Sequence, residues 1–323
     1  MFRLLQSMFG GEKKGTFPES LIKMAIERAV DGTDPWLRAV SGYKKKLRPA
    51  VLRAMDHVVA TVDALPPPIS VHFGSYKDER CLKGYFISSR EMQDVFSKDR
   101  TLAEFMQAGS VPSKIIALLA MEKQERVTFG SALTGDVVTH DVPLVTVSFD
   151  AHRLIDPTGD EQETRRFLKR RAFDHLLSLA LKQLSVVKGE RKELERHRAL
   201  LQAKLNVLER EGWGFDPAAA KSDAAQAEEQ LRKIEEEMKA VGGDYGENEA
   251  YLEIVAEVLG NPEQYFLSKS ETIFVNQVGF KQSEPASDVN ELSFTELYNA
   301  AGRRLAVMLI AIDAEELRGL AAV

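Results

Sequence analysis

The chain has 323 residues, of which 44% are hydrophobic and 28% are charged, and its formal net charge is −6. This length predicts two structural units, and the ordinary apolar and charged content argues against global disorder. The mild acidic excess argues against a general nucleic-acid coat protein, although a local basic surface stays open. The single cysteine, Cys81, cannot form an internal disulfide, so we expect a reducing, cytoplasmic setting.

The first eleven residues, MFRLLQSMFGG, predict a short amphipathic helix. Phe2, Leu5 and Phe9 fall on its apolar side, with polar residues opposite. Its polar interruptions argue against a secretion signal, and the longest apolar run elsewhere, residues 305–312, is too short to span a bilayer. We expect these three side chains to dock on the protein's own body, on a partner, or on a lipid surface.

Residues 18–65 carry apolar side chains at spacings of three and four, which predicts helices. Asp34 followed by Pro35 is typical of an N-cap and a first helical position. The run Pro66–Pro68 ends the last of these helices. We expect residues 1–65 to form the amphipathic N-terminal helix and a small helical bundle.

After the prolines, residues 69–88 predict one or two short strands. Ser88 with Glu91, and Thr101 with Glu104, are spaced as capping boxes, in which the two side chains satisfy free N–H groups at a helix start. We therefore expect a short helix after each pair.

The next apolar segment predicts a helix that starts at Ser110, with Pro112 in its first turn and apolar side chains at residues 115–119. From Arg126 onward, the chain is rich in β-branched residues. This composition predicts a hairpin or a three-stranded meander.

The middle of the chain predicts two long helices. A helix that begins near Gly159 carries a wide apolar stripe, which narrows beyond Gly189 to single leucines in a charged background. The glycines of GWGFDP interrupt it, and Asp216 before Pro217 predicts the start of a returning helix. One narrow apolar seam on each side of this break predicts an inserted antiparallel coiled-coil arm over residues 190–241.

Two aromatic residues, Trp213 and Phe215, fall at the predicted tip of this arm. Aromatic side chains at a projecting end are good anchors for a protein partner, although they can equally close the end of the seam. The seam itself could be satisfied within one chain or between two chains. We therefore expect a protein partner and leave a homo-oligomer open.

Strand-like segments return at residues 271–282, 290–298 and 303–313. The continuous apolar run at residues 305–312 predicts a central strand that is covered on both faces. Strands thus occur on both sides of the predicted arm. The predicted fold is α+β and mainly helical, with one antiparallel or mixed sheet, and its body comprises residues 66–189 and 242–323.

Two basic clusters could contact phosphate if each presents its charges on one face. The first lies in YKKKLR and the second in RRFLKRR. Their basic residues are Lys44, Lys45, Lys46, Arg165, Arg166, Lys169, Arg170 and Arg171. Nucleic acid and an anionic membrane surface are both reasonable ligands, whereas solvated helix faces explain the same pattern without a ligand.

Candidate chemistry is sparse in the sequence. His140, Asp141, Asp150 and His152 could hold a metal ion if their strands pair, although their spacing matches no recognised ligand pattern. Glycine-bearing segments fit neither a phosphate loop nor a dinucleotide-binding pattern, and no nucleophile elbow is present. We therefore expect no cofactor.

The leading hypothesis is a non-catalytic protein-interaction or assembly factor, cytoplasmic or peripheral to the inner membrane. It would bind through the coiled-coil arm and the N-terminal helix. The alternatives are a nucleic-acid-associated protein that uses the basic clusters, and a metal-dependent enzyme with a site near residues 140–152.

Overall fold

The computed structural model describes residues 17–74, 80–109, 111–134, 137–210, 217–242, 246–276, 278–284, 289–299, 302 and 304–321. These residues divide into two compact units. We call them the sheet unit, which contains residues 56–172 and 263–321, and the helical unit, which contains residues 17–55 and 173–262. The three-part division predicted at residues 65, 189 and 241 uses other boundaries and stays a prediction.

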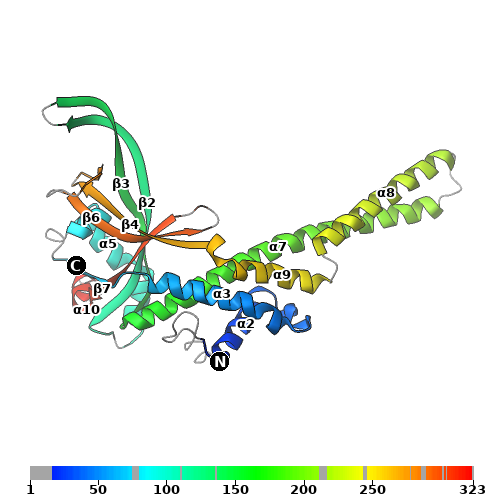
Figure 1. Cartoon of the computed structure of the whole chain (residues 1–323), viewed down its shortest axis with the longest axis horizontal. Coiled ribbons are helices and arrows are strands. Elements are labelled where there is room, and N and C mark those ends of the chain that lie inside the picture. The colour runs from blue at the N-terminus through cyan, green and yellow to red at the C-terminus, as the bar shows by residue number, and fades with distance from the viewer. Residues whose placement is uncertain are drawn as a thin grey trace. The chain divides into compact units, whose positions relative to one another are not determined.

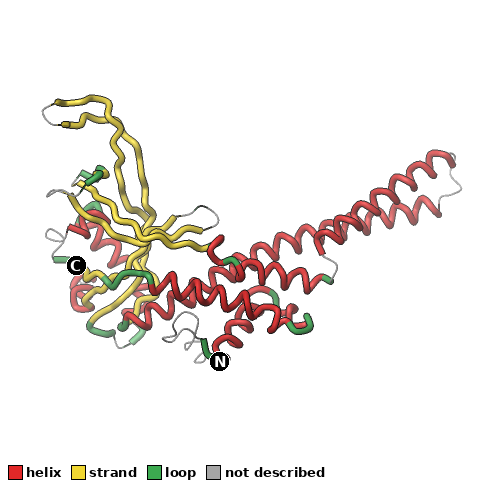
Figure 2. The backbone as a smooth tube through the Cα atoms, viewed as in Figure 1, coloured by secondary structure: helices red, strands yellow, loops and turns green. Residues whose placement is uncertain are grey.

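Within the described residues, seven strands form a single sheet (Figure 2). Six of them follow the order β3-β2-β7-β6-β4-β5, and β1 pairs with β7 in parallel, so the sheet is mixed. The strands are β1 (Ile69–Val71), β2 (Lys114–Thr134), β3 (Val137–Thr158), β4 (Phe266–Asn276), β5 (Lys281–Gln282), β6 (Val289–Asn299) and β7 (Arg304–Asp313). Strands from both sides of the long helices thus share one sheet, which confirms the predicted α+β fold.

Strand β7 is the centre of this sheet, as its continuous apolar sequence predicts. It pairs with β2 from Lys114↔Asp313 to Met121↔Ala306, and with β6 from Thr295↔Val307 to Tyr298↔Arg304. Ala306 to Ile312 are all buried. A strand whose two faces are both covered requires apolar side chains at successive positions.

The sheet curls, so that its two ends meet. The backbone N–H of Val147 in β3 donates to the carbonyl of Gly279, which lies between β4 and β5, at 2.9 Å. Thr146 and Phe280 form an antiparallel bridge beside it. Gly279 has φ of 94°, a left-handed conformation that favours glycine. The inner face of the curl is therefore enclosed by β3 on one side and β5 on the other.

Short helices cover the apolar face of the sheet: α4 (Arg80–Tyr85), α5 (Ser89–Lys98), α6 (Arg100–Gln107) and α10 (Ala314–Ala321). Tyr85, Met92, Phe96 and Leu102 of these helices, and Phe86 just after α4, belong to the same buried cluster as Phe149 and Phe294 of the sheet. On the opposite face, Val62, Leu65 and Leu168 pack against Leu118 and Leu309. Both sides of the central strands are thus removed from water.

Two local predictions were wrong in this unit. The segment from Ser110 is not a helix, because residues 114–134 form β2, in which alternate apolar side chains face opposite sides of the sheet. The second short helix begins at Arg100 with Asp99 as its N-cap, rather than after Thr101. Residues 69–88 give one strand, β1, which agrees with the predicted one or two strands, and also the helix α4, which the sequence did not indicate.

Three further local predictions were confirmed, whereas the predicted cap at Asp216 lies outside the described residues. Ser88 caps α5 by accepting a hydrogen bond from the Glu91 N–H at 3.1 Å. Asp34 likewise accepts from the Trp36 N–H at 2.9 Å and starts the short 3-10 helix η1 (Pro35–Ala39). The β-branched region forms a long two-stranded hairpin of β2 and β3 (Figure 2).

The helical unit contains α2 (Glu19–Thr33), η1, α8 (Pro217–Gly242), α9 (Glu247–Gly260) and parts of α3 (Tyr43–Asp63) and α7 (Glu161–Arg210). Leu21, Ile26 and Val30 of α2 are buried. Arg28 of α2 forms a two-pronged ion pair with Asp174 of α7. Charge-assisted pairs of this geometry fix the two helices in one register.

None of the helices in the described residues is long and apolar enough to cross a membrane.

Candidate protein-interaction surface

Helices α7 and α8 run side by side in the helical unit (Figure 1). Leu201 and Leu205 of α7 are buried, as are Ala227 and Ile234 of α8. Arg198 and Glu235 form an ion pair across the two helices at 3.4 Å. These contacts leave one face of each helix covered and the others open to solvent.

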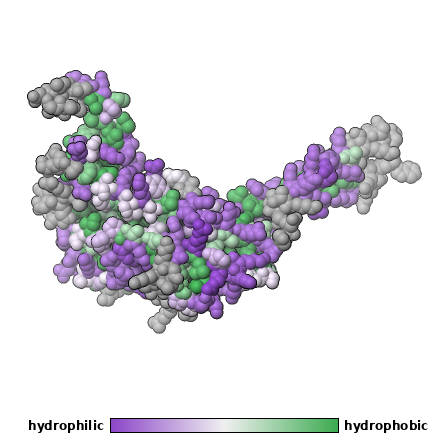
Figure 3. Space-filling model, in the orientation of Figure 1, coloured by the Kyte–Doolittle hydropathy of each residue, from purple (hydrophilic) through white to green (hydrophobic). Residues whose placement is uncertain are grey.

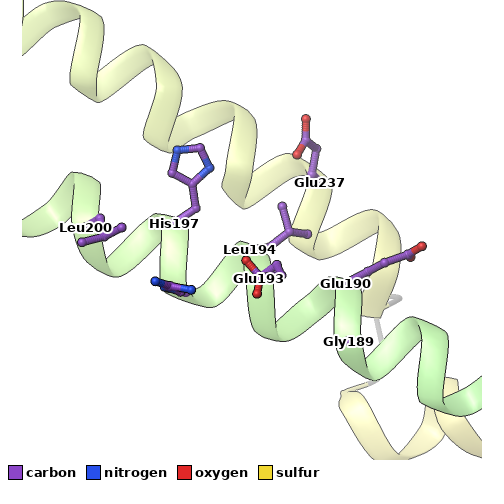
Figure 4. A pocket seen from close by; sticks show the side chains of 8 residues that line it. Gly189, Glu190, Glu193, Leu194, His197, Leu200 and Glu237 are labelled. Carbon is purple, nitrogen blue, oxygen red and sulfur yellow. The ribbon is translucent and has the colours of Figure 1, made fainter.

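An open groove of about 790 Å³ lies along this helix pair (Figure 4). Seven of the lining residues come from about three turns of α7, and one comes from α8. They are Gly189, Glu190, Glu193, Leu194, Arg196, His197, Leu200 and Glu237. The groove therefore combines apolar side chains with charges of both signs.

Helix α7 carries two exposed aliphatic residues fourteen positions apart, of which Leu200 lines the groove. The side chain of Val186 is 54% exposed and that of Leu200 is 62% exposed. Glu193 lies midway between them in sequence, so the three positions are seven residues apart and fall on one face of the helix. Large exposed aliphatic residues on an otherwise charged helix are candidates for partner contact.

The sequence pattern does not indicate this surface, because it predicts a single apolar stripe on each helix. The signal that could have found it is the seven-residue spacing of Val186, Glu193 and Leu200, which lies beside the predicted seam. Helix α7 thus exposes two aliphatic residues, Val186 and Leu200, outside the predicted seam.

The hairpin of β2 and β3 has a second exposed apolar surface (Figure 3). Beyond Met121, β2 pairs only with β3. The side chains of Val127 and Phe129 in this part are 64% and 73% exposed. Their cross-strand neighbours Val145 and Pro143 are also apolar.

A cluster of charged residues, of which the Lys123 and Glu296 side chains are buried, lies where the apolar face of the sheet ends. Lys123 of β2, whose side chain is 8% exposed, lies 2.7 Å from Glu271 of β4 and 3.4 Å from Glu296 of β6. Glu125 lies 3.5 Å from Lys123 and 3.2 Å from Lys281 of β5. The ion pairs thus connect four strands across the inside of the curl.

The pKa values in this cluster are set by these contacts. Burial lowers the pKa of Lys123, but the hydrogen bond to Glu271 and the charge of Glu296 outweigh it, so the pKa is raised. Burial raises the pKa of Glu125, but Lys281 and Lys123 reverse this effect and leave it lowered. The pKa of the Tyr298 hydroxyl is raised, chiefly because it donates a hydrogen bond to Glu296.

These directions favour a structural role for the cluster. A lysine that is held in its protonated form at neutral pH has no free electron pair for attack or for accepting a proton. The nearby carboxylates are occupied by ion pairs, so the cluster is suited to joining strands.

The structure does not bring the predicted metal ligands together. His140 and Asp150 lie on the same strand, ten residues apart, which corresponds to about 33 Å along an extended strand. Asp141 has a positive φ of 58° at an irregularity of the hairpin. His152 instead stacks on Phe86 at a centroid distance of 4.6 Å. Among the described residues, no group of three or more His, Cys, Asp or Glu side chains is arranged to hold a metal ion.

The second basic cluster is largely engaged with the protein itself. Arg165 is buried and donates to the carbonyls of Val62, Leu65 and Pro66 at 2.8, 3.0 and 3.2 Å. Lys169 is also buried and lies 2.7 Å from Asp63.

The remaining members of that cluster are more accessible. Arg171 forms a two-pronged ion pair with Asp156, and Arg166 lies 3.4 Å from Glu163. Arg170 is half-buried. The five basic side chains therefore point to different surroundings and do not form one common phosphate-facing surface.

The first basic cluster lies at the start of α3. Lys44 pairs with Glu27 at 2.8 Å and Lys46 with Glu249 at 2.7 Å, while Lys45 is exposed. The hydrogen bond from Lys44 lowers the pKa of Glu27 to about 2. These pairs favour a role in joining α2, α3 and α9 within the helical unit.

The predicted anchors Trp213, Phe215, Phe2, Leu5 and Phe9 lie outside the described residues.

No known protein family, no curated protein and no solved structure matches the chain.

Proposed function

We propose that this chain is a non-catalytic protein-interaction or assembly factor, located in the cytoplasm, that binds a protein partner through helices α7 and α8. The observation that carries the proposal is the open groove on this helix pair, in which Leu200 and Leu194 lie among charged side chains. An apolar patch with a charged rim is the usual composition of a protein-binding surface.

The proposal includes an inserted antiparallel coiled-coil arm at residues 190–241. Its support is the spacing of apolar residues: Leu194, Leu201 and Leu208 are seven residues apart in α7, as are Ala227 and Ile234 in α8. Leu201, Ala227 and Ile234 are buried, and the described positions between Ala227 and Ile234 are largely exposed. A narrow covered stripe on each helix is what a two-helix seam requires.

The deciding experiment replaces residues 190–241 by a short Gly-Ser linker and compares the proteins recovered by affinity purification with those recovered by the full chain. We expect the specific partners to be lost, while circular dichroism shows that the deletion variant is folded. A folded deletion variant with an unchanged set of partners would contradict the proposal.

A point variant locates the contact more narrowly. Leu200→Glu places a charge in the groove, whereas Gln202→Glu places the same charge on an exposed position two residues away and outside it. We expect the first variant to lose partners and the second to keep them. Equal recovery by both variants would place binding elsewhere on the arm.

A further inference from the structure

We infer that the outer stripe of α7 binds a second copy of the same stripe, so that two chains associate through antiparallel α7 helices. We define the stripe as Val186, Gly189, Glu190, Glu193, Arg196, His197 and Leu200, all of which are exposed. This inference rests on the proposed function, for which it names one partner.

The stripe is centred away from the face of α7 that α8 covers, and Glu237 of α8 lines the groove along its edge. At 100° per residue, its seven positions fall within an arc of about 120° centred on Glu193. Leu194, Leu201 and Leu205, on the side of α8, lie about 80° to 120° from that centre. A second chain can therefore approach α7 without displacing α8.

Charge and size select one arrangement of the two stripes. With a twofold axis at Glu193, Val186 of each chain faces Leu200 of the other, because the two residues lie seven positions on either side of the axis. Glu190 faces Arg196 twice, and opposite charges at these spacings stabilise helix pairs. These apolar and charged pairs follow from the order of residues along α7 alone.

Gly189 faces His197 in this arrangement. A Cβ atom at Gly189 would meet nothing within 4 Å in the single chain, so the position is open to an incoming side chain. A glycine in a long exposed helix destabilises that helix relative to alanine. Room for an imidazole from the second chain gives this glycine a packing role.

The two Glu193 side chains meet at the axis, where like charges oppose association. Arg196 and His197 of the opposite chain lie about one helical turn away along the axis, roughly 4.5–6 Å, and offset this repulsion. A parallel arrangement has no such compensation, because it places Glu190 beside Glu190, Glu193 beside Glu193 and Arg196 beside Arg196. Shifting the antiparallel helices by one heptad puts Val186 opposite Glu193, which also loses the apolar contact.

The experiment is sedimentation of the full-length chain and of two charge-reversal variants. We expect the wild type to show a dimer whose population rises with concentration. Glu190→Arg and Arg196→Glu should each weaken self-association at least tenfold, because each creates two like-charge contacts. Gln202→Arg, on the opposite face of α7, should leave the dissociation constant unchanged.

Mixing the two reversed variants tests the register. An equimolar mixture should form a heterodimer, because the arginine introduced by Glu190→Arg then faces the glutamate introduced by Arg196→Glu, while the unchanged Glu190 and Arg196 face each other. The double variant that carries both reversals should again form a homodimer. Variants that fold, by circular dichroism, but show no recovery on mixing would overturn the antiparallel register.

A cross-link at the axis gives a second readout. In a Cys81→Ser background, Glu193→Cys should be joined between chains by a short bismaleimide, and Gln202→Cys should not. A wild type that stays monomeric at its highest soluble concentration would overturn the inference. That result leaves the proposed function intact if deletion of residues 190–241 still removes other partners, so the two can fail separately.

Discussion

Arg165 is the basic residue whose surroundings differ most from those expected of an anion-binding side chain. Its guanidinium donates to three carbonyls at and just beyond the end of α3, where helix carbonyls lack partners within the helix. Helical spacing in RRFLKRR predicts a charged face, but burial against the preceding segment depends on contacts about 100 residues away in sequence. The pattern alone could not distinguish the two roles.

Replacing Arg165 by methionine should lower the free energy of unfolding by about 3 kcal/mol, because buried carbonyls lose charged donors. Urea denaturation followed by circular dichroism measures the change. Arg171→Met is the matched control, since its ion pair with Asp156 is at the surface and should contribute less than about 1 kcal/mol. Equal losses in the two variants would show that Arg165 is not a structural donor.

Replacing Lys123 by methionine should destabilise the sheet unit. The change leaves Glu271 and Glu296 close together without their shared cation. Removing one partner of a buried ion pair costs about 3–5 kcal/mol, so we expect a loss of that size at neutral pH, measured by urea denaturation. Lys98→Met, which removes an exposed pair with Asp94, should change stability by less than about 1 kcal/mol.

The loss of unfolding free energy caused by Lys123→Met should also depend on pH. The lowered pKa of Glu125 gives stability that is present above its ordinary value of 4.5 and is lost as the pH falls through the lowered value. The raised pKa of Lys123 gives stability that is present below 10.5 and is lost only as the pH rises through the raised value. Without Lys123, the pKa of Glu125 is lowered less, so the difference in unfolding free energy between wild type and variant should narrow as the pH falls from about 4.5 through the lowered pKa of Glu125. A constant difference over this interval would contradict the ionic role of Lys123.

At the scale of elements, α4 is held against β6 by a close contact. A Cβ atom on Gly84 of α4 would overlap the side chain of Leu292, which is fully buried in β6. Gly84→Ala should therefore lower the free energy of unfolding by about 1–3 kcal/mol, through overpacking. Gly319→Ala in α10 meets nothing within 4 Å and should be neutral or stabilising by up to about 1 kcal/mol. Thermal unfolding of the two variants separates these outcomes, and a Gly84→Ala variant as stable as wild type would mean that Leu292 moves freely.

The elements that could be predicted from the sequence are those with an unambiguous period or a local cap. The run at residues 305–312 is long enough, and apolar enough, to indicate a strand with two covered faces. Ser88 and Asp34 signal helix starts through contacts only two or three residues away.

The segment at residues 114–121 shows why other elements could not be predicted. Its apolar residues at 115, 116, 118 and 119 suit a helix as well as a buried strand, and short apolar runs carry no period that separates the two. The strand is selected by pairing with β7, almost 200 residues later in the chain. The Lys123 cluster likewise depends on contacts between distant strands, since its carboxylates come from β4 and β6. Charged residues on an otherwise apolar strand face were the signal in the sequence that could have indicated it.

At the scale of the whole molecule, neither unit is a continuous piece of chain. The sheet unit needs residues 56–172 and 263–321, and β7 pairs with β2, β6 and β1. A truncation after Gly260 removes β4 to β7 and leaves β1 and β2 without their central neighbour. We expect this fragment to lack a cooperative unfolding transition and to be digested rapidly by protease, whereas the variant without residues 190–241 should unfold cooperatively and resist protease. A truncated fragment that melts cooperatively would contradict the central role of β7.

The late position of β7 has a consequence for synthesis on the ribosome. Strand β2 is complete at residue 134, and β7 begins about 170 residues later. At about 5–20 residues per second, the delay is on the order of ten seconds or more. During that interval the nascent chain holds an apolar strand whose hydrogen-bonding edge has no partner, and such edges pair readily with other chains. Efficient production of this protein should therefore depend on a holding chaperone that protects β2 until the last strand emerges.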